Sequence, residues 1–199
     1  MAALRAPRAW QRMLSGRRLD LLDPSPLDIE IEDIAHGLAR VARWNGQTSG
    51  PHIFSVAQHS LLVEAIASQL DAKLTARARL FILLHDTPEY VIGDMISPFK
   101  AVIGITYKAI EERILSAVLL RFSLEAMQSQ SLTRLTKRAD RAAAFFEATR
   151  LAGFPEAEAE LFFGRPRFLP DGLDRLLTPA SSEEIEHRFL KRFGALAGA

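Results

Sequence analysis

The chain has 199 residues, 48% of them hydrophobic and none of them cysteine. This length can bury one sizeable core, so we expect a single domain, and the lack of cysteine excludes disulfides and thiolate metal ligands. The 25 basic and 24 acidic residues nearly cancel, which argues against a uniform field that attracts nucleic acid or an anionic membrane. The apolar runs are too short to span a membrane, and a reducing, cytoplasmic setting is expected.

Residues 1–25 are predicted to be an N-terminal lead-in. Met1 to Arg18 contains five arginines and no acidic residue, a composition that organellar transit peptides share. The alternative is an ordered segment, because Trp10, Met13 and Leu14 are spaced to cover a neighbouring surface.

A helical core is predicted over residues 26–155. Between Pro24 and Gly46 the apolar residues Ile34, Leu38 and Val41 recur at helical spacing, and this first helix is expected to end near residues 44–46. The next helix is expected to begin at a capping box of Ser55 and Gln58. His59 lies on the apolar face of that helix and should point inward.

The stretch from Thr75 to Asp86 is apolar nearly all round and predicts a buried helix. Pro88 disfavours helix at the residue before it, so His85 and Asp86 are expected in the last turn. Further helices are predicted over residues 103–118, over residues 132–146, which carry Asp140, and around residues 185–193. Residues 156–199 would form a C-terminal extension packed on the core, and no convincing sheet is visible. We therefore expect an all-α fold in one compact domain.

Two imidazoles and two carboxylates stand out on these helices: His59, His85, Asp86 and Asp140. Such a mixed nitrogen and oxygen set suits a borderline divalent ion with room left for water, as catalysis requires. Burying His85 and Asp86 beside large apolar residues is costly unless a partner compensates the charge. Ordinary core packing with a buried histidine–aspartate hydrogen bond is the alternative.

Three segments together carry a family resemblance. Residues 54–60 read Phe-Ser-Val-Ala-Gln-His-Ser, residues 83–100 read Leu-Leu-His-Asp-Thr-Pro-Glu-Tyr-Val-Ile-Gly-Asp-Met-Ile-Ser-Pro-Phe-Lys, and residues 137–140 read Lys-Arg-Ala-Asp. In the order H…HD…D they resemble the HD-domain phosphohydrolase superfamily, which has a helical-bundle fold. More narrowly, they resemble the branch of bacterial 5′-deoxynucleotidases of the YfbR type.

The resemblance implies that His59, His85, Asp86 and Asp140 hold one divalent metal ion per chain. The acidic positions after the HD pair, Glu89 and Asp94, would act on the water nucleophile or the leaving group, although a helix first turn or a tight turn explains them equally well.

Arg43 would bind phosphate, or it is a solvated residue at a helix end. Lys100 is either a phosphate contact or a surface residue, and Lys137 is a possible third cation. Relatives often have histidine where this chain has Gln47, which puts a role for Gln47 in doubt. His36, His52 and His187 lack a partner pattern.

The implied activity is a metal-dependent phosphohydrolase acting on phosphate monoesters, foremost a 5′-nucleotidase for (deoxy)nucleoside monophosphates. Alternatives are a nucleoside triphosphate phosphohydrolase and a non-catalytic metal- or nucleotide-binding module. Residues 87–139 contain no histidine, which argues against the dinuclear members of this fold. Glu89 is followed by Tyr90, which argues against guanosine tetraphosphate hydrolases.

The expected partner is a small nucleotide or other phosphate ester, without nucleic acid or membrane. Arg43 and Lys100 are the cations of the motif region expected to reach the metal, which favours a monophosphate over a triphosphate. Relatives are often dimers, so the predicted helix over residues 103–118 or the C-terminal segment is a candidate homodimer interface.

Overall fold

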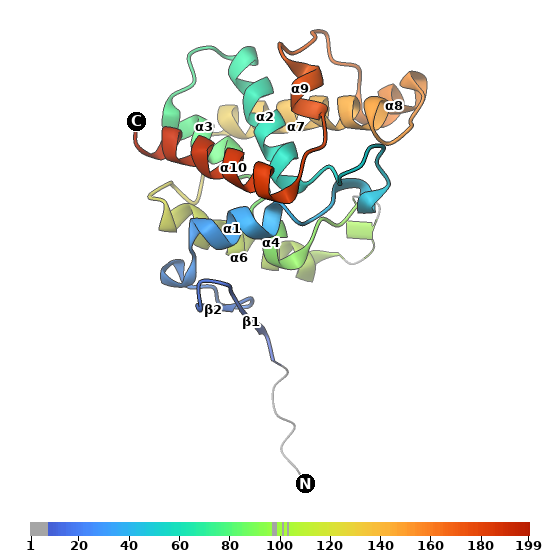
Figure 1. The fold of residues 1–199 in the computed structure, drawn as a ribbon. Helices are drawn as coiled ribbons and strands as arrows, with labels where there is room; N and C mark the ends of the chain where they lie inside the picture. The colour runs from blue at the N-terminus through green and yellow to red at the C-terminus, as the bar shows by residue number, and fades with distance from the viewer. Residues whose placement is uncertain (1–7, 97–98, 101, 103) are drawn as a thin grey trace.

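The computed structural model describes residues 8–96, 99–100, 102 and 104–199. The first seven residues of the predicted lead-in and Ile103, where a helix was expected to begin, lie outside the described residues. The described chain is mostly helical and forms one compact body around a single core, so the predicted all-α fold is confirmed (Figure 1). None of the described helices is long and apolar enough to cross a membrane.

The lead-in forms a short antiparallel hairpin, which the sequence reading did not anticipate. Strand β1 (Trp10–Arg12) pairs with β2 (Arg18–Asp20), and Trp10 lies opposite Asp20. Leu19 is fully buried, and the backbone N–H of Ser15 donates to Asp33 at 2.9 Å, which ties the hairpin to the next helix. Leu14 is 75% exposed and covers nothing, because it lies at the tip of the turn.

The first predicted helix is shorter than expected. After the 3₁₀ turn η1 (Pro26–Asp28), helix α1 spans Ile31–Leu38, and a separate 3₁₀ turn, η2, spans Arg43–Gly46. Between them the backbone becomes extended at Ala42, which forms an isolated bridge with Ser55. The pairing of Ala42 with Ser55 therefore ends the helix before residues 44–46, where it was expected to end.

Helix α2 spans Val56–Leu70 and begins at the predicted cap, where the Ser55 hydroxyl accepts from the Gln58 N–H. Helix α3 (Ala76–Leu83) ends two residues earlier than needed to hold His85 in its last turn. The helix ends before His85, contrary to expectation, because the Thr87 hydroxyl donates to the Leu84 carbonyl at 2.7 Å and helps to end the helix. A turn over residues 84–88 then leads into α4 (Glu89–Ile92).

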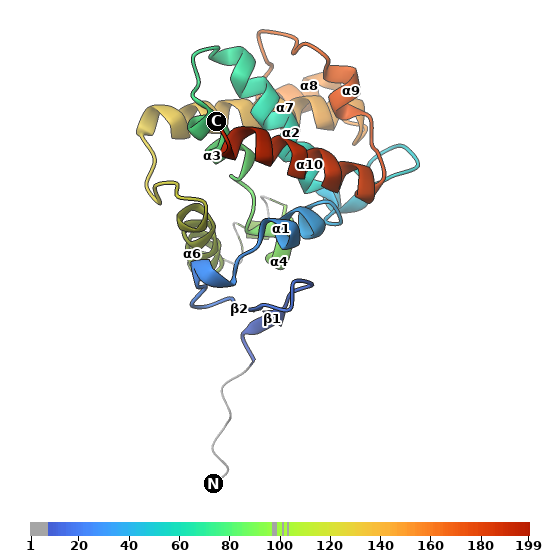
Figure 2. The ribbon, with the colours of Figure 1, turned by 60° about the vertical axis from the view of Figure 1, so that its left-hand side comes forward.

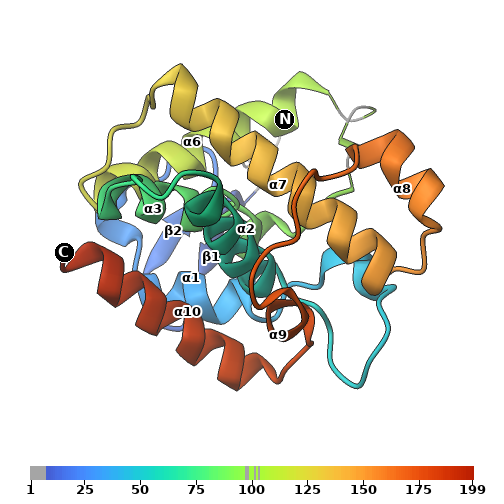
Figure 3. The ribbon, with the colours of Figure 1, turned by 90° about the horizontal axis from the view of Figure 1, so that it is seen from above.

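The second half of the chain supplies the long helices. Helix α6 spans Ile105–Arg121, and α7 spans Gln130–Arg150, capped by Ser129. Helices α8 (Glu156–Phe163) and α9 (Leu173–Leu177) precede α10 (Ser182–Ala197). Seen from above, α7 crosses α2, and the connection between α8 and α9 passes over α7 (Figure 3).

The C-terminal helix packs on the front of the core. Helix α10 contacts α1, α2 and α3 and buries Ile185 and Phe189 among them (Figure 2). Its Arg192 forms a two-pronged ion pair with the buried Glu64 of α2, at 2.8 and 2.9 Å. Arg79 of α3 donates to the same carboxylate at 2.6 Å, so three helices meet at one charge cluster.

Candidate metal centre

Three separate elements bring histidine and aspartate side chains to one point. His59 comes from α2, His85 from the turn after α3, and Asp140 from α7. The centroids of the two imidazole rings are 5.5 Å apart. One possible ligand atom from each of the three residues lies within 4.8 Å of the other two. Oδ1 of Asp140 is 3.2 Å from Nε2 of His59.

Asp86 lies beside this group of three residues. Its Oδ2 lies 3.4 Å from Nε2 of His59 and 3.3 Å from Nε2 of His85. The structure therefore brings together all four residues that the sequence proposed as metal ligands, although they lie on elements up to 81 residues apart.

The two histidines each leave one nitrogen without a hydrogen bond. Nε2 of His59 and Nε2 of His85 are buried and form no hydrogen bond within the described part of the chain, although carboxylate oxygens lie 3.2–3.4 Å away. Buried polar atoms without partners are rare, because each one loses its bond to water. Imidazole nitrogens and carboxylate oxygens suit Mn²⁺, Co²⁺ or Zn²⁺, so a divalent ion among these four residues fits the site.

Both rings are held from behind in the orientation that a metal ligand needs. Nδ1 of His85 lies 2.8 Å from the Ile82 carbonyl and donates its proton there. Nδ1 of His59 donates to Oε1 of Glu147 at 2.5 Å. In the neutral imidazole that binds a metal, each bond leaves the lone pair on Nε2, on the side of Asp86 and Asp140.

Glu147 is a buried residue that the sequence reading missed. It lies seven residues after Asp140 on α7, which puts both on the same helix face, and this spacing is the signal that could have found it. Its other oxygen accepts from Nε1 of Trp44 at 2.9 Å. Burial alone would raise the pKa of Glu147, but His59, Arg43 and Trp44 lower it to about 2.

The turn that carries Arg43 and Trp44 has an unusual backbone. Trp44 and Asn45 have φ angles of 56° and 50°, in the left-handed region that large side chains avoid. Trp44 is held there by its bond to Glu147 and by edge packing against Phe163, with ring centroids 5.7 Å apart. Backbone strain of this kind persists only where surrounding contacts hold it in place. Here the strained turn contacts Glu147, the residue that accepts the hydrogen bond from His59.

Arg43 lies between two carboxylates. Its Nη1 is 3.1 Å from Asp94 and its Nε is 3.4 Å from Glu147. Burial would lower the pKa of Arg43, but the charges of Glu147 and Asp94 raise it above its ordinary value. The guanidinium is thus permanently charged, and Nη2 makes no hydrogen bond to any part of the chain that the structure describes.

Glu89 and Lys100 form a pair on the other side of the site. Nζ of Lys100 is 3.3 Å from Glu89 and 2.8 Å from Glu111. The second oxygen of Glu89 is buried and has no hydrogen-bond partner among the residues that the structure describes. Burial, together with the charges of Asp86 and Asp94, raises the pKa of Glu89 well above its ordinary value. Glu89 therefore keeps a proton to higher pH than a solvated glutamate does.

The remaining polar candidates lie away from this cluster. Gln47 and His52 are exposed, and His52 lines a separate surface hollow between the loop before α2 and the start of α10. His36 faces Glu186 on the surface at 3.2 Å. Lys137 is exposed on α7 and lines a groove that also includes Asp140.

Comparison with known proteins agrees with this geometry. The family model of the HD domain matches residues 56–144. An uncharacterized protein of Rhodobacter capsulatus is 59% identical over 159 residues, which cover 80% of this chain and 81% of that protein. The chain belongs to the HD-domain superfamily. The matched segment of this HD-domain protein includes the four residues of the cluster, whereas Arg43 and Glu147 lie outside it.

Proposed function

We propose that this HD-domain protein is a metal-dependent phosphohydrolase that cleaves phosphate monoesters, with the 5′-phosphates of (deoxy)nucleosides as the first class to test. The observation that carries this proposal is the pair of buried Nε2 atoms that face two aspartates without hydrogen bonds. The resemblance to 5′-deoxynucleotidases of the YfbR type supports the choice of substrate.

His59, His85, Asp86 and Asp140 would hold the ion, with Glu147 and the Ile82 carbonyl orienting the two rings. A divalent ion bound there would lower the pKa of a bound water and would offset charge on phosphoryl oxygens. Two histidines and two aspartates leave coordination positions open for water and substrate.

Glu89 and Asp94 have different surroundings and therefore different proposed roles. Glu89 keeps its proton to higher pH and can give it to the leaving alkoxide of the nucleoside. Asp94 is engaged by Arg43 at 3.1 Å and would orient that guanidinium. Nη2 of Arg43 would then be the donor that contacts a phosphate oxygen.

Two alternative functions can be distinguished from this one by experiment. A nucleoside triphosphate phosphohydrolase would use the same ligands but release the triphosphate chain whole. A non-catalytic metal-binding module would be favoured by loss of the acidic groups, yet Glu89 and Asp94 both lie beside the cluster.

The deciding experiment is a phosphate-release assay on the purified full chain. Substrates would include AMP, dAMP, ATP and p-nitrophenyl phosphate, each with Mn²⁺, Co²⁺, Mg²⁺ or Zn²⁺ and with chelator. We expect inorganic phosphate from the monoesters with at least one metal and none with chelator. Absence of hydrolysis with every metal would support the binding module, and release of intact triphosphate from ATP would support the second enzyme.

A further inference from the structure

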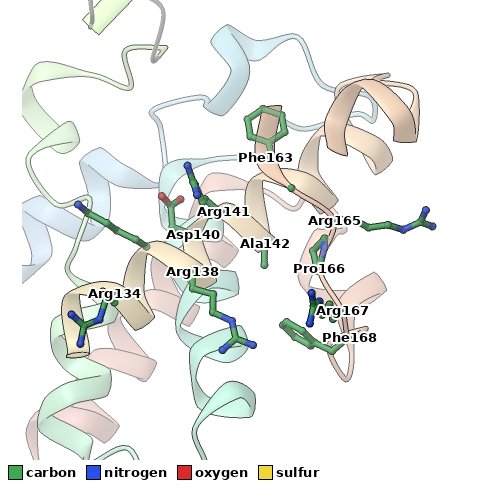
Figure 4. Close-up of a pocket in the computed structure, with 12 residues that line it drawn as sticks. Arg134, Arg138, Asp140, Arg141, Ala142, Phe163, Arg165, Pro166, Arg167 and Phe168 are labelled. Atoms are coloured by element: carbon green, nitrogen blue, oxygen red, sulfur yellow. The ribbon is translucent and has the colours of Figure 1, made fainter. Parts of the chain in front are cut away.

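A large groove opens beside the candidate metal centre and concentrates positive charge. Its volume is about 1060 Å³, and it lies between α7 and the segment that follows α8 (Figure 4). Asp140 belongs both to this groove and to the histidine–aspartate cluster. Six cationic side chains line it: Arg134, Lys137, Arg138, Arg141, Arg165 and Arg167.

Most of this charge is not compensated within the chain. Among the residues that the structure describes, Arg165 alone of the six forms an ion pair, with Glu156, and both side chains are more than half exposed. The other five have no carboxylate within ion-pair distance in the described part of the chain, and Asp140 is the single acidic residue in the lining. The groove is therefore strongly cationic, although the formal net charge of the whole chain is only +1.

Helical spacing explains how the groove comes to lie next to the cluster. Arg134, Lys137, Arg138 and Arg141 follow the i, i+3, i+4, i+7 pattern and form one stripe about 10 Å long on α7. Lys137 lies one turn before Asp140, and Arg141 directly follows Asp140. These two residues are therefore the cations of the stripe that lie nearest to the metal cluster. In Figure 4, Asp140 and Arg141 extend from the same side of α7, whereas Arg138 extends from the other.

The cations that the sequence assigned to the phosphate are neutralised by acidic neighbours. Arg43 pairs with Asp94 and Glu147, and Lys100 pairs with Glu111. A single phosphate at the metal is matched by the ion and the open edge of Arg43. A nucleoside monophosphate has no second phosphate, so it would leave the uncompensated cations of the groove without an anionic partner.

The groove also has apolar surface suited to a nucleoside. Phe163 and Phe168, both half-buried, line it together with Pro166. Aromatic faces next to cations bind stacked bases and phosphates together. The volume of the groove lies just above the usual range for small-molecule sites, about 300–1,000 Å³, and is larger than one phosphate requires.

We propose that the groove binds a second phosphate of the substrate, so that the preferred substrate is a nucleotide with at least one phosphate besides the one at the metal. This inference rests on the proposed function in one respect, because it requires one phosphate of the substrate to lie at the metal. Two sources share this chemistry: a second phosphate on the same ribose, as in adenosine 3′,5′-bisphosphate, and a phosphate chain, as in ATP. Lys137 and Arg141 are the residues that would contact it.

A binding measurement on the metal-free full chain tests the groove without activity. We expect adenosine 3′,5′-bisphosphate to bind the wild type roughly tenfold more tightly than AMP by calorimetry, with a difference that shrinks as salt is added. In the Lys137→Ala/Arg141→Ala variant the difference should be lost. The matched control is Arg150→Ala/Lys191→Ala, which removes the same charge from exposed positions outside the groove and should keep it.

Turnover provides the second arm, with the metal that supports activity. The ratio of kcat/KM for the bisphosphate to that for AMP should fall about tenfold in the groove variant and stay constant in the control. ATP in the same series identifies which source of the second phosphate is preferred.

Equal affinity of the wild type for AMP, bisphosphate and ATP would overturn the groove proposal, as would equal losses in both double variants. Failure of the proposed function looks different, because no monoester would then release phosphate with any metal while the binding preference persisted. Cleavage of ATP to triphosphate would support a second phosphate in the groove but refute the phosphomonoesterase.

Discussion

Nδ1 of His59 donates to the buried carboxylate of Glu147 at 2.5 Å, and this bond turns Nε2 of the same ring toward Asp140 and Asp86. The carboxylate is itself held by Trp44 and Arg43. A ligand ring that is oriented by a buried anion is a stronger and better-placed metal ligand than a free imidazole. The orientation of His59 thus depends on residues that lie outside the matched family segment.

Glu147→Gln should weaken metal binding by roughly 10- to 100-fold, because a neutral amide orients the imidazole less firmly than a carboxylate. Titration of Mn²⁺ or Co²⁺ by calorimetry measures this. Glu158→Gln, an exposed change on α8, is the control and should leave the affinity alone. An unchanged affinity in Glu147→Gln would show that the buried carboxylate has only a structural role.

Asp86→Ala should remove metal and activity together, because Asp86 is proposed to contact the ion directly. The melting temperature with metal should also fall toward that of the metal-free protein. An ion present at 100 times its Kd stabilises a fold by about 2.7 kcal/mol, and the variant would lose this term. An Asp86→Ala protein with one metal equivalent and full turnover would refute the ligand assignment.

Glu89→Gln should behave in the opposite way, keeping the metal and losing rate. The amide cannot give a proton to the leaving group, and general acid catalysis contributes about 10²- to 10⁴-fold. Metal content and kcat measured on the same preparation separate the two effects. Loss of metal together with rate would mean that Glu89 is a ligand instead of a proton donor.

Stability should depend on pH through Glu64, which joins α2 to Arg79 and Arg192. Burial would raise the pKa of Glu64, but the hydrogen bonds from the two arginines lower it below its ordinary value. The folded state therefore holds the proton less tightly than the unfolded state does. The resulting stabilisation is complete above the unfolded pKa and is lost as the pH falls through the folded pKa.

Glu64→Gln should accordingly lower the free energy of unfolding by roughly 2 kcal/mol at pH 7, because it leaves two half-buried arginines without their carboxylate. The gap to the wild type should narrow as the pH drops below about 4. Urea denaturation over that range measures the gap. Glu186→Gln, which removes a surface pair with Arg40, is the control and should cost below about 1 kcal/mol. A gap that stays constant with pH would contradict the role given to the Glu64 charge.

Gly37→Ala should destabilise the fold by about 1–3 kcal/mol, because the close approach of α1 to α4 has no room for a methyl group. A Cβ at Gly37 would lie 2.8 Å from the Tyr90 carbonyl oxygen and 2.9 Å from its Cβ. Tyr90 follows Glu89, so we also expect reduced turnover with metal binding retained.

Gly194→Ala is the matched control, since a Cβ there meets nothing within 4 Å. This exposed position inside α10 should gain about 0.5–1 kcal/mol from the better helix propensity of alanine. Thermal unfolding of both variants compares the two glycines directly, and equal changes would refute the steric explanation.

Periodicity in the sequence was enough to predict the longer helices, the capped start of α2 and the inward direction of His59, because these depend on residues within a few turns of each other. It did not predict the short helices α4, α8 and α9. The order of His59, His85, Asp86 and Asp140 along the chain also indicated the family. Local patterns could not place the end of α3 or the break after α1. There, a side-chain bond from Thr87 and pairing between Ala42 and Ser55 outweigh helix propensity.

Contacts between distant segments decided the rest of the site. Glu147 accepts the hydrogen bond from His59 only because α7 packs on α2. Arg43, which the sequence allowed to be a solvated residue, instead contacts Asp94 and Glu147 in the folded chain. Net charge failed as a guide for a related reason. Charges cancel in a sum over the chain, whereas folding brings the stripe of α7 and the segment after α8 to the same groove beside Asp140.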